Sequence, residues 1–587
     1  SQTALEGYMK ERVPGYMLPH VYQCLKKLPL TVNGKVNLQE LPRPYVERQT
    51  LSEMEVGEKE RILMAVLQDK LGVNHISIAD HFFYLGGDSI KAIQVSGKLK
   101  EYGYSLKTQD ILSNPVVGEM AAYMECQKKQ KYRLCHGNIE KLPVVSWFFN
   151  EEFYNPDYYN QGVLLRLTGK QQVDWANLLS LLVSRHDSLR ISYCKDSATI
   201  YYCEEAKGAI PEIRQCDLSD LPQKQYREVM EKEMASINES FRLESGLLIK
   251  GCHFYGGAQE YLYLCAHHLV VDGVSWRILL SDLEHLLEAM TLKREYVLPE
   301  QSDSYQVWVN TLYTRGFDKF LSERDYWLQT IKHAGYLSSL KREDNGKSGK
   351  IVTRELLFDA KDTQLLLMEA NYPFHTETME LLVCALMRSL SEVEKRKQVA
   401  VKLEGHGREE LFEDIDVLNT VGWFTTLYPY IVTVADNLDE HIKIVKQTLR
   451  GIPNKGIGYG ILAEENVLPG LELDNLVSFN YMGEFLSEAQ NPFFCLEDYG
   501  LILRSDEGNH LPALVDINGY IYEKRLKFFI SYDTRRVKEE KVLELLNTFE
   551  WELRQTIYSC LENKNVDVTV SDFDIDMSKE DFDKIFS

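Results

Sequence analysis

The sequence lacks three features that would assign a function class directly. It has no excess of basic residues: 66 Lys and Arg stand against 88 Asp and Glu, giving a formal net charge of −22, which argues against a nucleic-acid backbone as partner. No apolar run is long enough to span a bilayer, and the first residues lack the apolar core of a signal peptide. The eleven cysteines form no CxxC pair and are odd in number. We therefore expect a cytoplasmic protein with reduced thiols.

A chain of 587 residues is too long for one ordinary hydrophobic core, so we expect two to four domains. Hydrophobic residues make up 44% and charged residues 26%, the balance of globular domains. Polar stretches at residues 46–57 and 128–141 are interpreted as linkers. Between them apolar residues recur at helical spacing, whereas strand and helix patterns alternate from residue 142 onward.

The most informative stretch is HHLVVDGVSW at residues 267–276, which follows a β-rich run and precedes leucines at helical spacing. Because neighbouring side chains of a strand point to opposite faces, one of His267 and His268 can face a cavity while the other packs inward. Asp272 can fix the loop through a hydrogen bond or an ion pair, and Ser275 is placed to cap the following helix. Two structural histidines are the plain alternative. A zinc site is disfavoured because no nearby Cys or His completes the ligands.

The helical region is centred on DHFFYLGGDSI at residues 80–90. Two glycines release the chain, and Ser89 opens a helix in which Ile90 and Ile93 are expected to face inward. A serine in this place is most often an N-cap. The alternative is attachment of a phosphodiester, for which a hydroxyl at the positive end of a helix is a favourable seat. No GxSxG turn surrounds Ser89, so a hydrolase nucleophile is not expected.

Four further strings mark the second half: VKLEGHGRE at 401–409, TVGWFTTLYP at 420–429, PNKGIGYG at 453–460 and SFNYMGEF at 478–485. Glu404 ends a strand pattern in the first, and alone such a glutamate is usually an exposed ion-pair partner. The apolar and aromatic string TVGWFT by itself indicates only buried core residues. The glycine-rich string lacks the Walker spacing, so nucleotide binding is not expected. Asn480 and Tyr481 would by default form satisfied buried hydrogen bonds.

Together these strings resemble the domains of nonribosomal peptide synthetases. FFxLGGDSI resembles the peptidyl carrier protein motif. HHLVVDGVSW, EGHGRE, TVGWFT, PNKGIGYG and FNYxGxF resemble, in that order, the epimerization-domain form of the condensation superfamily. Val145 departs from the family pattern, which usually has Gln there. YMLP followed by LPLTVNGKV resembles the C-terminal end of an adenylation domain, whose substrate-contacting lysine corresponds to Lys35.

The resemblance implies a small four-helix carrier bundle followed by a two-lobed α/β domain of the chloramphenicol-acetyltransferase type. The implied boundaries are an adenylation remnant at 1–45, a linker at 46–57, the carrier at 58–127, a linker at 128–141, an N-lobe at 142–310, a C-lobe at 311–570 and an acidic tail at 571–587. The large nucleotide-binding portion of an adenylation domain is not in this sequence, so we expect no adenylation by this chain.

The implied activity is L-to-D epimerization of an aminoacyl or peptidyl thioester through an enolate. The resemblance makes His268 and Glu404 the opposed acid/base pair, and it places Asn480 and Tyr481 in the same site as positioning or enolate-stabilising groups. The remaining implied roles are structural for His267 and Asp272, supporting for His406 and Arg408, and covalent attachment of 4′-phosphopantetheine for Ser89. No metal is implied.

The partners implied are the acyl thioester on the chain's own carrier, a phosphopantetheinyl transferase, an upstream adenylation domain and a downstream condensation domain. Two other functions remain open. A condensation domain, which forms peptide bonds, shares the HHxxxDG loop, and Glu404 discriminates between the two reactions. A non-catalytic docking module would bind the carrier without exchanging the α-proton. Which amino acid is the substrate is not readable, because the selecting pocket is missing.

Overall fold

The computed structural model describes residues 57–73, 75–126, 135–169, 173–204, 209–244, 247–294, 302–334, 338–342, 350–484, 491–563 and 569. The chain divides into two units, residues 1–61 and 62–587, and of the first only residues 57–61 are described. The predicted adenylation remnant with Lys35, the linker up to residue 56 and the acidic tail lie outside the described residues. No helix in the described ranges is both long and apolar enough to cross a lipid bilayer.

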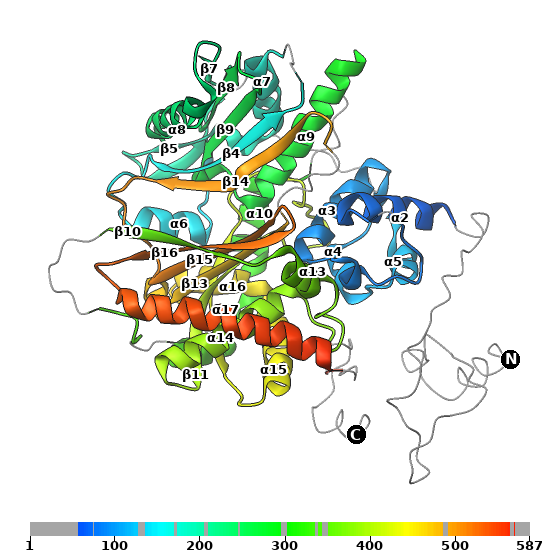
Figure 1. The fold of residues 1–587 in the computed structure, drawn as a ribbon, viewed down its shortest axis with the longest axis vertical. Coiled ribbons are helices and arrows are strands. Elements are labelled where there is room, and N and C mark those ends of the chain that lie inside the picture. Colours follow the sequence, from blue (N-terminus) through cyan, green and yellow to red (C-terminus); the bar gives the residue numbers. More distant parts are fainter. Residues whose placement is uncertain are drawn as a thin grey trace, which may run out of the picture. The chain divides into compact units, whose positions relative to one another are not determined.

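The carrier region is a small helical bundle (Figure 1). Its elements are α2 (Glu58–Leu71), η3 (Phe82–Leu85), α3 (Ser89–Glu101), α4 (Thr108–Ser113), α5 (Val117–Tyr123) and the antiparallel pair β1 (Tyr104–Ser105) and β2 (Glu125–Cys126). The apolar stripe predicted for the first helix is buried at Leu63, Val66 and Leu67, and it packs with Phe82 in one core. The predicted four-helix carrier bundle is thus confirmed.

The larger domain begins with α6 (Pro143–Asn150) and contains a first sheet with the strand order β14-β4-β9-β8-β7. These strands are β4 (Tyr159–Leu167), β7 (Ile213–Asp217), β8 (Ile249–Tyr255), β9 (Tyr261–His267) and β14 (Phe494–Ser505). A smaller sheet contains β3 (Asn138–Ile139), β5 (Ile191–Cys194) and β6 (Thr199–Tyr202), with η4 (Asp187–Arg190) leading into β5. The associated helices are α7 (Trp175–Arg185), α8 (Gln223–Glu239) and α9 (Gly273–Leu292).

A second, six-stranded sheet has the order β10-β16-β15-β13-β11-β12. The strands are β10 (Ile351–Leu357), β11 (Gln398–Gly405), β12 (Thr426–Thr433), β13 (Val477–Glu484), β15 (Val515–Tyr522) and β16 (Arg525–Asp533). Its helices are α13 (Ala360–Met368), α14 (Thr378–Glu394), α15 (Leu438–Arg450), η8 (Pro453–Gly456), α16 (Ile457–Glu464), η9 (Leu473–Asn475) and α17 (Glu539–Glu562). Before this sheet the chain forms α10 (Tyr305–Thr311), a π-helical turn η7 (Leu312–Gly316), α11 (Phe317–Leu321) and α12 (Arg324–Ala334). The predicted two-lobed α/β architecture is confirmed.

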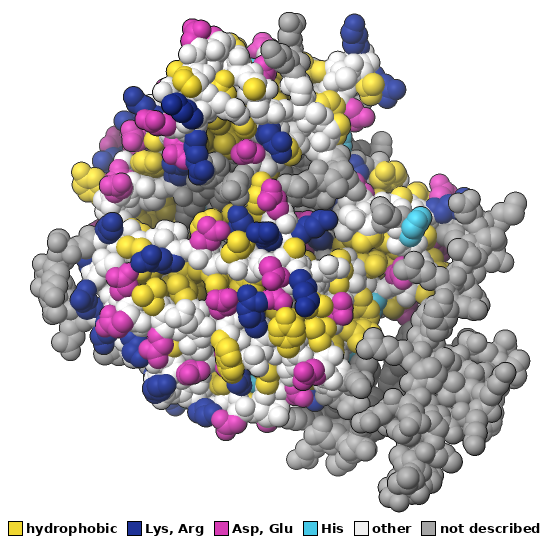
Figure 2. Space-filling model, in the orientation of Figure 1, with side chains coloured by type: hydrophobic (Ala, Val, Ile, Leu, Met, Phe, Trp, Pro, Cys, Tyr) yellow, Lys and Arg dark blue, Asp and Glu magenta, His cyan; other side chains and the backbone are white. Residues whose placement is uncertain are grey.

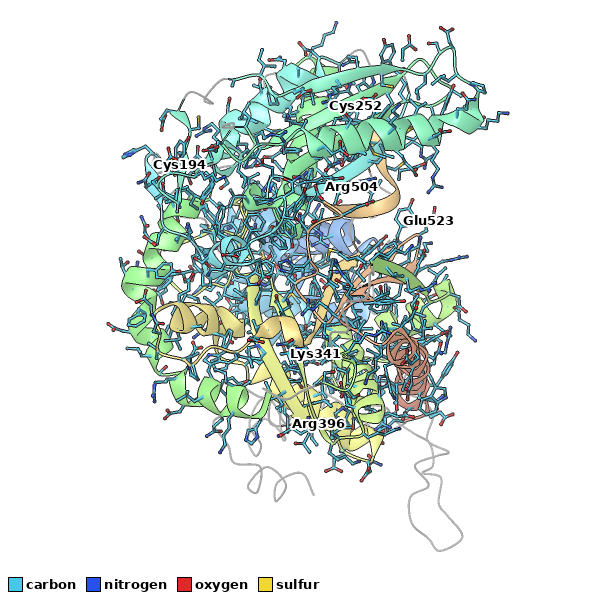
Figure 3. The ribbon with its side chains drawn as sticks, turned by 90° about the vertical axis from the view of Figure 1, so that its left-hand side faces the viewer. Cys194, Cys252, Lys341, Arg396, Arg504 and Glu523 are labelled. Carbon is cyan, nitrogen blue, oxygen red and sulfur yellow. The ribbon has the colours of Figure 1, made fainter. Side chains whose placement is uncertain are left out.

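Strand β14 joins the two halves. It pairs antiparallel with β4, from Ser505↔Tyr159 to Phe494↔Leu167, and Figure 1 shows it along the edge of the first sheet. In Figure 3, Arg504 of this strand lies in the same part of the molecule as Cys252 of β8, whereas Lys341 and Arg396 lie in the opposite part. The first sheet therefore takes a strand from the range predicted for the C-lobe. A single core cluster contains residues of both sheets.

Two local predictions were wrong. The N-cap of α9 is Asp272, whose side chain accepts the backbone N–H of Ser275. A carboxylate is as good a cap as a hydroxyl, and here it begins the helix three residues earlier. In α3, Ile93 is buried as predicted, but Ile90 is only half-buried.

Candidate active site

His267 is the last residue of β9, and its ring is fully enclosed. The Nε2–H donates to the carbonyl oxygen of Pro156 at 2.8 Å, and Nδ1 accepts the backbone N–H of Leu269 at 3.0 Å. Burial lowers the pKa of His267 to about 3, so the ring is neutral at physiological pH. Because both nitrogens are engaged by the backbone, this histidine shapes the loop and offers nothing to a substrate.

His268 is the first residue of the short helix η6 (His268–Val270). Its ring contacts side chains of other residues. The ring centroid lies 4.3 Å from that of Trp423 and 5.6 Å from that of Tyr159. The amide nitrogen of Gln161 donates to Nε2 at 2.7 Å, and Nδ1 has no hydrogen-bond partner among the residues that the structure describes. Burial lowers the pKa of His268 to about 4. The site therefore holds a neutral imidazole that is suited to proton transfer.

Asp272 links the histidine loop to the EGHGRE loop. Its carboxylate accepts two hydrogen bonds from the Arg408 guanidinium, at 2.7 and 3.0 Å, and one from the backbone N–H of Phe424 at 3.0 Å. Both side chains are buried. Burial alone would raise the pKa of Asp272, but Arg408 and the backbone donors hold it below its usual value. The ion pair suggested for Asp272 is thus present, and its partner is Arg408.

Glu404 lies at the end of β11, where its Cα pairs with that of Leu427 on β12. Burial, and then the negative charge of Asp516, raise the pKa of the Glu404 carboxyl to about 7, while Lys402 opposes the shift. At neutral pH this carboxyl therefore exchanges readily between its two protonation states. A carboxyl whose pKa is raised in this way by its surroundings can donate or accept a proton near pH 7.

Strand register sets the positions of Asn480 and Tyr481 on β13. Lys402 of β11 pairs in parallel with Ser478 of β13, so Asn480, two residues on, lies on the same sheet face as Glu404. Tyr481 points to the opposite face, and its hydroxyl is buried without a hydrogen-bond partner within the described ranges. Asn480 and Glu404 thus lie on the same face of two neighbouring strands, and Tyr481 lies on the other face.

Tyr159 is the common neighbour of the two proposed acid/base residues. Its ring stacks on that of His268. Burial, and then the charges of Asp516 and Glu404, raise the pKa of its hydroxyl. Sequence reasoning missed both Tyr159 and Gln161, because they lie on β4 without a motif of their own and approach the site only through β4–β9 pairing, which joins Gln161 to Ala266. Trp423 carried a signal, since it lies in TVGWFT, but alone it indicated only core.

Ser89 is the first residue of α3, and Asp88 is its N-cap, accepting the backbone N–H of Lys91 at 2.7 Å. The start of this 13-residue helix suits a phosphodiester, because the unpaired N–H groups and the helix dipole favour an anion there. The local structure therefore fits covalent attachment of 4′-phosphopantetheine.

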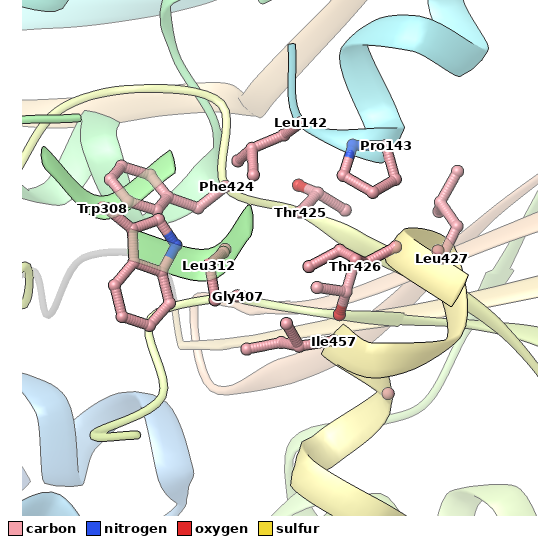
Figure 4. Close-up of a pocket in the computed structure, with 13 residues that line it drawn as sticks. Leu142, Pro143, Trp308, Leu312, Gly407, Phe424, Thr425, Thr426, Leu427 and Ile457 are labelled. Atoms are coloured by element: carbon pink, nitrogen blue, oxygen red, sulfur yellow. The ribbon is translucent and has the colours of Figure 1, made fainter. Parts of the chain in front are cut away.

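The structure has two further features, a small cavity and a group of possible metal ligands. A cavity of about 20 Å³ is lined by apolar residues that include Leu142, Phe424 and Ile457 (Figure 4); it holds about one water molecule and is too small for a substrate. Within the described ranges, one group of possible metal ligands comprises Glu151, Asp474 and His510. His510 Nε2 already lies 2.7 Å from a Glu151 oxygen.

Comparison with known proteins agrees with this architecture. Residues 145–577 match the condensation domain family, and residues 61–124 match the phosphopantetheine attachment site family. The chain is 33% identical to gramicidin S synthase 1 of Brevibacillus brevis over 613 residues, covering 99% of this chain and 55% of that protein. It is 32% identical to surfactin synthase subunit 1 of Bacillus subtilis, covering 99% of this chain and 17% of the relative. The chain thus spans about half or less of these relatives.

Among solved structures, the larger domain is similar to the epimerization domain from the third module of tyrocidine synthetase B. The TM-score is 0.66 at 27% identity, and the match covers 74% of this chain and 99% of that domain. The first condensation domain of the calcium-dependent antibiotic synthetase, at 16% identity and a TM-score of 0.57, shares the fold.

Proposed function

The chain belongs to the condensation-domain family, and from that premise we propose that its larger domain epimerises the α-carbon of an acyl group carried as a thioester on the preceding carrier. The observation that supports the proposal best is Glu404, which can serve as a second proton-transfer group near His268. Burial, and then the charges of Asp516 and Glu404, raise the pKa of Tyr159. The ring of Tyr159 stacks on that of His268. Epimerization needs a proton removed from one face of the α-carbon and delivered to the other, so it needs two such groups or one mobile group. The similarity to a solved epimerization domain supports the same assignment.

The protonation states give the pair complementary roles. A buried imidazole with a pKa of about 4 is neutral at pH 6–7, whereas at least half of the carboxyl groups with a pKa of about 7 are then protonated. We infer that His268 accepts the α-proton of one isomer and Glu404 donates a proton to the opposite face. In the reverse direction the two exchange roles. General acid–base catalysis of this kind contributes about 10²–10⁴-fold.

The remaining rate enhancement requires stabilisation of the enolate oxygen. Asn480 lies on the sheet face of Glu404, and its side-chain amide is a donor of the required kind. We propose that Asn480 positions the thioester oxygen. The hydroxyl of Tyr481, on the other face, is available to orient the part of the substrate that enters from the carrier side.

We propose that Ser89 bears the 4′-phosphopantetheine, which when bound supplies the thiol for the acyl thioester. The thioester makes the α-proton of its acyl group removable. A phosphopantetheinyl transferase, an upstream adenylation domain and a downstream condensation domain would then act before and after this step. The substrate class is an aminoacyl or peptidyl group.

The proposal is tested by loading Ser89 with an L-aminoacyl-phosphopantetheine, incubating the chain in D₂O and analysing the released amino acid for chirality and α-deuterium. We expect an L/D mixture that contains deuterium in the native chain, and no D-isomer in His268→Ala. The Ser89→Ala variant should accept no acyl group. Unlabelled L-amino acid from the native chain, across several substrates, would contradict epimerization.

A condensation reaction is separated from epimerization by Glu404→Gln. This variant should lose racemisation. If the native chain instead transfers its acyl group to an added aminoacyl carrier, and Glu404→Gln does so equally well, the domain forms peptide bonds and the epimerase assignment is wrong.

A further inference from the structure

We propose that the domain carrying His268 and Glu404 has a docking surface for one carrier helix, α3, and that two acidic side chains select this helix by pairing with lysines near its two ends. The acidic residues are Glu484, at the end of β13, and Asp416, in the loop after EGHGRE. The proposal rests on the proposed function, because it concerns how the substrate is delivered to that site. Both partners belong to the compact unit of residues 62–587.

The charge pairs lie at opposite ends of α3. Lys91, in the first turn, lies 3.2 Å from a Glu484 oxygen. Lys100, in the last turn, forms an ion pair with Asp416. Nine residues of helix separate the lysines, a rise of about 14 Å, so the two pairs fix both the position and the direction of α3. The backbone N–H of Leu418 donates to the Asp416 carboxylate at 3.2 Å, which holds that carboxylate in place.

Two glycines allow the close approach that these pairs require. A Cβ atom on Gly483 would lie 2.9 Å from a carboxylate oxygen of Asp88, the residue before Ser89. A Cβ atom on Gly97 would lie 2.6 Å from the Asn419 side-chain oxygen. A glycine inside a helix is destabilising relative to alanine. Close packing of the helix against Asn419 explains why glycine stands at position 97, whereas the carrier alone does not explain it.

A third contact fixes the carrier on the other side of Ser89. Tyr84 of η3 lies with its ring centroid 4.9 Å from that of Tyr372, and its hydroxyl is 3.2 Å from Nδ1 of His375. Tyr372 remains half exposed. Aromatic contacts of this kind add to the burial of apolar area.

The consequence is that α3 begins directly over the end of β13, the strand that bears Asn480 and Tyr481. Arg277 of α9 also contacts this strand end by donating to the carbonyl oxygen of Met482. The N-terminal end of α3 therefore lies near the end of β13, which the Arg277 side chain joins to α9, the helix that follows the His268 loop. The occupant that fits the surface is a carrier helix with an acidic N-cap and lysines at its third and twelfth positions.

A charge exchange in the full chain tests the docking surface. Lys91→Glu and Glu484→Lys each place like charges together, and we expect the rate of D-isomer formation on the tethered substrate to fall roughly fivefold, in line with loss of one partly exposed ion pair plus repulsion. The double variant restores the pairing and should return to within about twofold of the native rate. Glu239→Lys, the same charge change at the end of α8, should leave the rate unchanged.

Two further readouts separate failure of docking from failure of the proposed function. An aminoacyl-pantetheine thioester free in solution does not need docking, so its epimerization rate should be the same in all four variants. Zero-length carbodiimide coupling should join Lys91 to Glu484 and Lys100 to Asp416 in the unmodified chain, and mass spectrometry should find the Lys100–Asp416 link reduced in Lys91→Glu. If the native chain epimerises nothing, the coupling still tests docking.

Gly97→Ala gives an independent result. The substitution stabilises an isolated helix but collides with Asn419, so it should lower the tethered rate and the Lys100–Asp416 coupling while leaving the free-thioester rate unchanged. Tethered rates and Lys100–Asp416 coupling yields that stay native in both Gly97→Ala and Lys91→Glu would overturn the docking surface.

Discussion

Adjacent residues of one type can have opposite roles, and the histidine pair illustrates why. Both ring nitrogens of His267 form hydrogen bonds with backbone groups, whereas His268 contacts the side chains of Gln161, Trp423 and Tyr159. The alternation of a strand end explains the difference. The sequence indicated that one histidine would face inward, but the aromatic surroundings that lower the pKa of His268 come from segments about 110 and 155 residues away in the chain and could not be read from the motif.

The pH dependence of the reaction follows from the two shifted pKa values. In the proposed reaction, the reactive state pairs neutral His268 with protonated Glu404, and this state predominates between about pH 4 and pH 7. The first-order rate on the tethered substrate should therefore decline above pH 7 as Glu404 loses its proton. Rates measured from pH 5 to pH 9 test this; a rate that keeps rising through pH 9 would contradict it.

The raised pKa of Glu404 also has a cost in stability. The pKa of its carboxyl changes from 4.5 to about 7 on folding. Between these pH values the folded state therefore binds more protons than the unfolded state, and the stability of the fold decreases as the pH rises through them. Glu404→Gln removes this effect. We expect the variant to be more stable than the native chain by about 1–2 kcal/mol at pH 8, with no such gain at pH 4.5.

Denaturant unfolding at the two pH values measures this difference, and Glu239→Gln serves as the control at an exposed site. An equal change at pH 4.5 and pH 8 would show that burial of a charged carboxylate is not the cause.

At the scale of elements, the predictions that succeeded were those set by local pattern. The strand before the histidines, the helix after them, the helix opened by Ser89 and the strand ending at Glu404 all occur where the sequence places them. The partners of these elements were not predictable. β14 joins the first sheet from more than 320 residues away in the chain, and Asn480 lies beside Glu404 only through the β11–β13 register.

The buried pair of Asp272 and Arg408 is the clearest tie between the two loops. Arg408→Met leaves a buried carboxylate unpaired and should destabilise the domain by about 3–5 kcal/mol. Asp272→Asn together with Arg408→Met removes the uncompensated charge and should recover part of that loss. Denaturant unfolding compares both with Arg315→Met, which breaks the exposed pair with Asp414 and should cost less than about 1 kcal/mol. Equal losses in the buried and exposed variants would contradict the assigned tie.

At the scale of the whole molecule, a carrier and a condensation-family domain share one compact unit. Figure 2 shows acidic and basic side chains interspersed over the viewed face, so the net charge of −22 is not gathered into a single patch there. Recognition of the carrier then depends on a few placed pairs. The proposed reaction, in which a tethered substrate reaches His268 and Glu404, would depend on several elements together.

The most direct test of the account is hydrogen exchange at the α-carbon with one group of the pair removed. Carrier-tethered L- and D-aminoacyl thioesters are incubated separately in D₂O with His268→Ala and with Glu404→Gln, and deuterium and chirality are measured in each. Two opposed groups predict that each variant exchanges the α-hydrogen of one enantiomer only, without inversion, and that the two variants select opposite enantiomers. Exchange of both enantiomers by the same variant, or of the same enantiomer by both variants, would contradict an opposed His268–Glu404 pair.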